Sequence, residues 1–96
     1  MAKLERRTVH VLISGRVQGV YYRGWTMQTA LALGLTGWVR NRYDGQVEAI
    51  LAGDASAVAD MLEACKQGPP DAVVDAVHIV QEGGAAPDGF EVLADA

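Results

Sequence analysis

The chain has 96 residues, of which 50% are hydrophobic and 21% charged, so it has enough apolar surface for a folded core and too much for a disordered tail. We expect a single domain over residues 1–96. The net charge of −4 argues against broad binding of nucleic acid. The single cysteine, Cys65, excludes an internal disulfide, and with only two histidines no metal site is expected.

The distribution of charge and hydropathy indicates a compartment and a kind of ligand. Seven of the eight Lys and Arg residues lie in residues 1–43, and this basic half can hold a small anion. The longest uncharged stretch, residues 24–39, is broken by three glycines and three threonines and does not predict a membrane span. Residues 1–7 lack the apolar run of a secretion signal, so the expected location is the cytoplasm, with no membrane partner.

The first predicted element is a strand over Thr8–Ser14. Its side chains alternate, with Val9, Val11 and Ile13 on one face, which is the period of a half-buried strand. The next residues, Gly15–Gly19, are bracketed by glycine and are expected to form a short loop.

A helix is predicted from about Tyr22 to Leu33. Small or apolar residues recur at helical spacing and would share its buried face (Met27, Ala30, Leu31 and Gly34). Gly34 can adopt the left-handed conformation that ends a helix, and Leu35 is placed to fold back on the last turn.

Residues 37–42 and 46–52 are expected to form the two strands of a hairpin. A two-residue turn would set arginines opposite apolar side chains on one face. A three-residue loop with a left-handed Gly45 instead pairs Arg40 with Glu48, so we expect this second register. It places three side chains on the open face and two on the face that the helices cover (Trp38, Arg40 and Arg42; Val39 and Asn41).

Asp54 is expected to cap a second helix that ends at residues 68–70. Its predicted buried face is again set by helical spacing (Val58, Met61, Leu62 and Cys65). Cys65 is therefore expected to be a buried apolar residue rather than a nucleophile. A strand over about Val73–Gln81, a loop over residues 83–89 and a short strand over Gly89–Leu93 complete the chain.

The order of elements is strand, helix, strand, strand, helix, strand, with a short fifth strand. It favours an α+β fold of the ferredoxin-like βαββαβ type, a sandwich in which an antiparallel sheet carries both helices on one face. If the first two strands pair in parallel around the first helix, the loop after one and the end of the other lie at the same end of the sheet.

The segment from Gly15 to Arg23 carries the main functional signal. A glycine-bracketed turn before a helix directs backbone N–H groups toward one point, and the helix N-terminus adds unpaired donors and partial positive charge. Arg23, in the first helical turn, adds a planar guanidinium suited to two phosphate oxygens. The segment predicts an anion site, and a plain connector is the alternative because such turns are common.

Asn41 is the second candidate. On the helix-covered face its amide would be buried, and burial costs about 1–3 kcal/mol when the amide has no partner. Either nearby backbone satisfies the amide, or the amide is directed toward the anion site and holds a water molecule there.

Residues 15–23 (GRVQGVYYR) and 37–41 (GWVRN), followed by Gly45-Gln46-Val47 and Gly53, resemble the two signature segments of the acylphosphatase family. The resemblance implies hydrolysis of the carboxyl–phosphate bond of small acyl phosphates, with no metal and no cofactor. It implies that Arg23 binds phosphate and that Asn41 orients water. The phosphate-binding positions that it implies are Gly15, Arg16, Val17, Gln18, Gly19, Val20 and Arg23.

Two features depart from the family pattern. Tyr22 stands where the family commonly has phenylalanine, a change that keeps the ring and adds a hydroxyl group. Residues 93–96 lack the aromatic residue often found near the family's C-terminus. The sequence therefore does not predict a role for this tail in positioning Arg23.

Other functions are weighed against this one. A non-catalytic binding module could hold a phosphate-bearing effector in the same loop, but it would not need Asn41. RNA binding on the sheet would need an aromatic pair on adjacent central strands, which the sequence lacks, so no nucleic acid is expected. Tyr21, Trp25 and Met27 are expected to be core or lip residues. No apolar patch demands a protein partner, so we expect a monomer.

Overall fold

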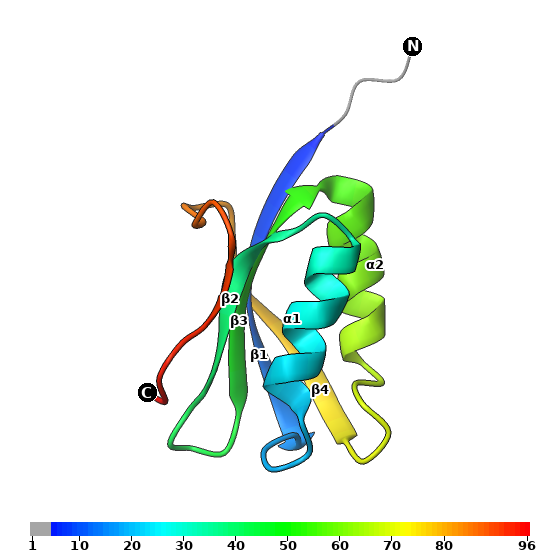
Figure 1. Cartoon of the computed structure of the whole chain (residues 1–96), viewed down its shortest axis with the longest axis vertical. Helices are drawn as coiled ribbons and strands as arrows, with labels where there is room; N and C mark the ends of the chain where they lie inside the picture. The colour runs from blue at the N-terminus through cyan, green and yellow to red at the C-terminus, as the bar shows by residue number, and fades with distance from the viewer. Residues whose placement is uncertain (1–4) are drawn as a thin grey trace.

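The computed structural model describes residues 5–96, so most of the segment assessed for a secretion signal lies outside it. The chain forms five strands and two helices (Figure 1). In chain order these are β1 (Arg6–Arg16), α1 (Tyr22–Ala32), β2 (Thr36–Asn41), β3 (Val47–Asp54), α2 (Ala55–Cys65), β4 (Val73–Glu82) and β5 (Phe90–Val92).

The five strands form one sheet in the order β4-β1-β3-β2-β5. The three pairs among β4, β1, β3 and β2 are antiparallel, and both helices cover the same face of the sheet (Figure 1). The predicted ferredoxin-like fold is therefore confirmed. The short strand β5 adds a parallel edge beside β2, which makes the sheet mixed.

One detail of the predicted topology is wrong. β1 and β2 do not pair with each other, because β3 lies between them and is antiparallel to both. Since β1 and β2 still run in the same direction, the loop after β1 and the end of β2 reach the same end of the sheet. Figure 1 shows this end at the bottom, where the first turn of α1 also lies.

The hairpin has the predicted register. Arg40 lies opposite Glu48 and Asn41 opposite Val47, and Gly45 has a φ of 93° in the connecting loop. Val39 and Asn41 are buried on the side of the helices, whereas Arg40 is half-buried on the open face. Charge pairing across the strands therefore selects the register that turns Asn41 inward.

The core lies between the sheet and the helices. Val9, Val11 and Ile13 of β1 are fully buried there, as predicted. In α2, Val58, Met61 and Cys65 are fully buried and Leu62 is partly buried. Asp54 precedes α2 as predicted, but its side chain makes no capping hydrogen bond and instead lies 3.8 Å from the Arg6 guanidinium.

The predicted buried face of α1 is partly wrong. Leu31 is 55% exposed, and the buried row consists of Tyr22, Thr26 and Ala30, which repeats at i, i+4, i+8. The Thr26 hydroxyl donates a hydrogen bond to the Tyr22 carbonyl oxygen at 2.8 Å. Because this bond meets the hydrogen-bonding need of the hydroxyl, a polar residue can occupy the buried face of the helix. The end of the helix is as predicted, since Gly34 is left-handed and the Leu35 N–H donates to the Ala30 carbonyl oxygen at 2.9 Å.

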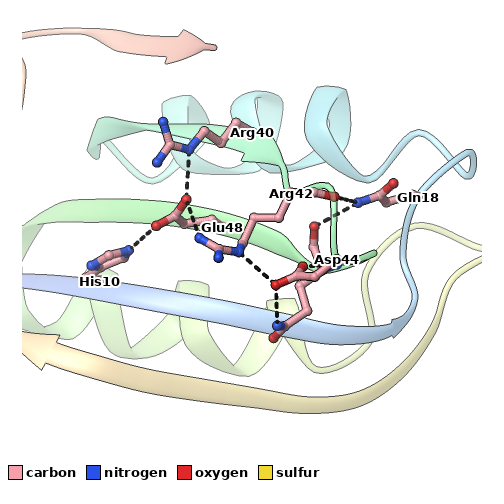
Figure 2. A network of polar contacts seen from close by, with 7 residues as sticks. His10, Gln18, Arg40, Arg42, Asp44 and Glu48 are labelled. Atoms are coloured by element: carbon pink, nitrogen blue, oxygen red, sulfur yellow. Dashed lines mark hydrogen bonds and ion pairs between the residues drawn. The ribbon is translucent and has the colours of Figure 1, made fainter. Parts of the chain in front are cut away.

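The open face of the sheet carries a charged network centred on Glu48 (Figure 2). The Glu48 carboxylate lies 2.6 Å from His10 Nε2 and accepts a 2.7 Å hydrogen bond from Arg40 Nε, and only 5% of its side chain is exposed. Burial by itself raises the pKa of Glu48, but the hydrogen bonds from Arg40 and His10 outweigh it and hold the pKa below its usual value. Glu48 is therefore ionised in the folded protein at neutral pH.

We expect Glu48→Gln to lower the free energy of unfolding at pH 7 by about 1–3 kcal/mol, because glutamine cannot accept both charge-assisted bonds. A carboxyl whose pKa is depressed by folding stabilises the fold above its unfolded pKa, and the contribution is lost as pH falls through the folded pKa. The difference between wild type and variant should therefore shrink below about pH 4.5.

Denaturant unfolding of both proteins between pH 7 and pH 3 measures this difference. Glu63→Gln is the matched control, because Glu63 pairs with Lys66 on an exposed helix surface and should contribute little. A stability difference for Glu48→Gln that does not change with pH would contradict the assigned ionisation.

Candidate active site

A cavity of about 310 Å³ opens at the end of the sheet where the loop after β1, the start of α1 and the end of β2 meet. Two of its lining residues are Arg23 and Asn41, the two predicted catalytic residues. The complete lining is Val17, Gly19, Tyr21, Tyr22, Arg23, Gly24, Asn41 and Val92. The two predicted residues, which are 18 positions apart in sequence, thus share one concave site.

The predicted phosphate-binding segment divides between a strand and a loop. Gly15 and Arg16 still belong to β1 and lie opposite Val74 and Val73 of β4. A Cβ on Gly15 would collide with the Val73 carbonyl oxygen, so glycine is needed here for the close approach of two strands. Of the remaining positions, Val17 and Gly19 line the cavity, whereas Gln18 and Val20 do not.

The Gln18 side chain ties the loop to the β2–β3 hairpin. Its Nε2 donates to the Arg42 carbonyl oxygen at 2.8 Å and to the Gln46 carbonyl oxygen at 2.9 Å, which Figure 2 shows in part. The loop that lines one side of the cavity is therefore fixed to the hairpin that carries Asn41. This contact was not anticipated from the sequence, which indicated only a backbone role for Gln18.

We expect Gln18→Ala to weaken the binding of inorganic phosphate by about three- to tenfold, because the loop backbone would lose two hydrogen bonds that hold it in place. The dissociation constant of phosphate is measured by titration calorimetry. Gln67→Ala removes an exposed glutamine outside the cavity and should change nothing. An unchanged constant for Gln18→Ala would show that the loop keeps its shape without the tether.

Arg23 lies in the first turn of α1, where the N–H groups at the helix start have no acceptor within the helix. Its side chain is 41% exposed, and its guanidinium lies 3.5 Å from the carboxylate of Asp95. The tail reaches this position because residues 93–96 continue alongside β2, where the Ala96 N–H donates to the Asn41 carbonyl oxygen at 3.0 Å. The tail therefore contacts Arg23 through an acidic side chain, which the sequence did not predict.

Asn41 is the last residue of β2 and is 8% exposed. Its Oδ1 is buried and has no hydrogen-bond donor among the described residues 5–96. The sequence left open whether nearby backbone groups satisfy this amide, and for the amide oxygen they do not. This oxygen without a donor belongs to a residue that lines the same cavity as Arg23.

Tyr22 anchors the start of α1 to the end of α2. Its buried hydroxyl donates to the Cys65 carbonyl oxygen at 2.6 Å, which explains how the extra hydroxyl group is accommodated in the core. Burial raises the pKa of the Tyr22 hydroxyl far above its usual value and raises the pKa of the Cys65 thiol to about 11. Cys65 is fully buried and stays protonated, so the prediction that it is an apolar core residue is confirmed.

Within residues 5–96, no three His, Cys, Asp or Glu side chains gather where they could bind a metal ion. None of the helices in the same range is long and apolar enough to cross a membrane.

Comparison with known proteins bears on the family of the chain. A family model described as Acylphosphatase matches residues 9–92. Proteins named Acylphosphatase from Rhodospirillum rubrum and Alcanivorax borkumensis are each 57% identical over 82 residues, which are 85% of this chain and 88% of the relative. A solved structure of an acylphosphatase from Coxiella burnetii has a TM-score of 0.88 and 33% identity, covering 97% of this chain and 100% of that one. From the family match and these identities, the chain belongs to the acylphosphatase family.

Proposed function

We propose that the protein hydrolyses small acyl phosphates to a carboxylate and inorganic phosphate, without a metal ion or cofactor. The observation that carries the proposal is that Arg23 and Asn41 line one cavity and that Asn41 is a buried amide whose Oδ1 has no donor among residues 5–96. A cavity that only bound phosphate would need donors and no free acceptor. An amide acceptor on a residue that shares a cavity with a guanidinium can hold a water molecule against a phosphoryl group bound there.

The phosphoryl group would be held by charge and by backbone donors. Arg23 supplies a planar fork for two phosphate oxygens, and the helix N-terminus supplies N–H groups and partial positive charge. Residues 17–20 of the loop add further backbone N–H groups near Gly19, which lines the cavity. These groups stabilise charge on the equatorial oxygens as the bond to the leaving group breaks.

Asn41 would direct the attacking water. Its Oδ1 accepts a hydrogen bond from the water, which aligns the water oxygen with phosphorus. As the new phosphorus–oxygen bond forms, the bond to the acyl oxygen breaks, and its electron pair leaves with the carboxylate. The water proton passes to solvent or to a phosphate oxygen.

The chemistry of acyl phosphates explains why so few catalytic side chains are needed for this hydrolysis. The leaving carboxylate is the conjugate base of an acid with a pKa around 4, so it needs no general acid at neutral pH. The loose transition state of phosphoryl transfer needs little deprotonation of the water. Positioning and charge stabilisation carry the reaction, and the chain can supply both without a metal ion.

The test is the loss of benzoyl phosphate, followed spectrophotometrically with and without a chelator. We expect turnover that the chelator does not change and that inorganic phosphate inhibits competitively. Phosphate binding without turnover would favour the alternative, a non-catalytic module that binds a phosphate-bearing effector. Dependence on added magnesium would contradict the metal-free mechanism.

We further propose that the protein acts as a monomer in the cytoplasm. The free, buried Cys65 fits a compartment where thiols stay reduced. Light scattering of the purified protein tests the oligomeric state, since a mass of twice 10.2 kDa would contradict it.

A further inference from the structure

We propose that Tyr21 forms one wall of a subsite for the acyl group, so that the site favours aromatic acyl phosphates over acetyl phosphate. This inference rests on the proposed function and deepens it by naming the substrate class. The sequence indicated that Tyr21 is a core or lip residue, and with 64% of its surface exposed Tyr21 is not in the core. An aromatic side chain left this exposed at the lining of a cavity is available to a ligand.

The backbone holds Tyr21 in an unusual conformation. Its φ is 71°, and it is the one residue other than glycine with a positive φ in residues 5–96. The left-handed region disfavours bulky side chains, so the surrounding structure must impose it. This conformation ends the loop after β1 and places Tyr21 directly before the first turn of α1.

Two neighbours hold the ring in place. Gln28 lies seven residues, or about two helical turns, after Tyr21, and its Nε2 donates to the Tyr21 hydroxyl at 2.9 Å. The ring lies over Gly24, where an added Cβ would come within 2.5 Å of two ring carbons. The ring is thus fixed across the first turn of α1 before any ligand binds, and a fixed flat surface loses little entropy on binding.

The direction of in-line attack points the acyl group toward this ring. Of the two predicted catalytic residues that line the cavity, Asn41 is 8% exposed and the side chain of Arg23 is 41% exposed, so a water held by Asn41 would attack from the more buried part of the lining. In-line displacement sends the leaving group away from the water, toward the open mouth. The exposed apolar side chains among the lining residues are Tyr21 and Val92, which is 42% exposed on β5. An aromatic acyl group leaving toward the mouth would cover apolar surface there, and a methyl group would cover little of it.

The experiment compares benzoyl phosphate with acetyl phosphate in wild type and Tyr21→Asn. Asparagine removes the ring and tolerates a positive φ better than most residues, so the loop should keep its shape. We expect the variant to raise KM for benzoyl phosphate about tenfold and to leave KM for acetyl phosphate and the inhibition constant of phosphate within about twofold. Tyr21→Phe, which keeps the ring, should stay within about threefold of wild type on benzoyl phosphate.

Tyr43→Ala is the matched control, because Tyr43 is 85% exposed and lies outside the cavity lining. It should leave both substrates unchanged. If wild type turns over neither substrate, the proposed function itself fails. If wild type turns over both and Tyr21→Asn changes KM for both by the same factor, the reaction stands and the acyl subsite is wrong.

Discussion

Replacement of Arg23 with lysine is expected to lower kcat/KM for benzoyl phosphate by about 10³-fold or more, close to the effect of Arg23→Ala. Lysine keeps the positive charge but loses the planar fork that can hold two phosphoryl oxygens at once. Binding should suffer as well as turnover, because the same contacts hold the phosphoryl group in the substrate and in inorganic phosphate. The inhibition constant of phosphate should therefore rise together with the loss of activity.

The control for this substitution is Arg6→Lys. Arg6 is an exposed arginine at the start of β1, its side chain is 72% exposed, and it lies outside the cavity lining. Its replacement should leave kinetics unchanged. If Arg23→Lys kept activity within tenfold of wild type, a point charge would suffice and bidentate binding by the guanidinium would be wrong.

The sequence was most informative where a local pattern also decides the three-dimensional contact. Pairing Arg40 with Glu48 predicted the register of the β2–β3 hairpin. Because side chains alternate along a strand, the same register predicted that Asn41 points inward. The end of α1 followed from Gly34 and Leu35. In each case the residues that interact lie within about ten positions of one another, so spacing along the chain is a sufficient guide.

The sequence was least informative where distant segments meet. The buried face of α1 depends on Tyr22 reaching the carbonyl of Cys65, 43 positions away. Gly15 is constrained by β4 rather than by a ligand, because the backbone of Val73 and Asp75 fills the space that a side chain would need. The contact of Asp95 with Arg23 depends on how the tail follows β2, and no pattern in residues 93–96 predicts this contact.

The substitution Asn41→Ala separates a catalytic amide from a structural one. We expect kcat for benzoyl phosphate to fall by about 10²–10³, which is the usual cost of removing one preorganised polar group from a site of this kind. The inhibition constant of phosphate should change little, because Arg23 and the loop would still bind the phosphoryl group.

The free energy of unfolding of the Asn41→Ala variant distinguishes the two roles more sharply than kcat does. The buried Asn41 Oδ1 has no donor among the described residues, and an unmet buried acceptor costs a fold about 1–3 kcal/mol. Removing it should therefore leave the free energy of unfolding unchanged or increase it, while the enzyme slows. An asparagine kept for the fold would show the reverse, with stability lost and kcat preserved among the folded molecules. Measuring kcat and denaturant unfolding on the same preparation decides between the two, because only a residue kept for the reaction loses activity without losing stability.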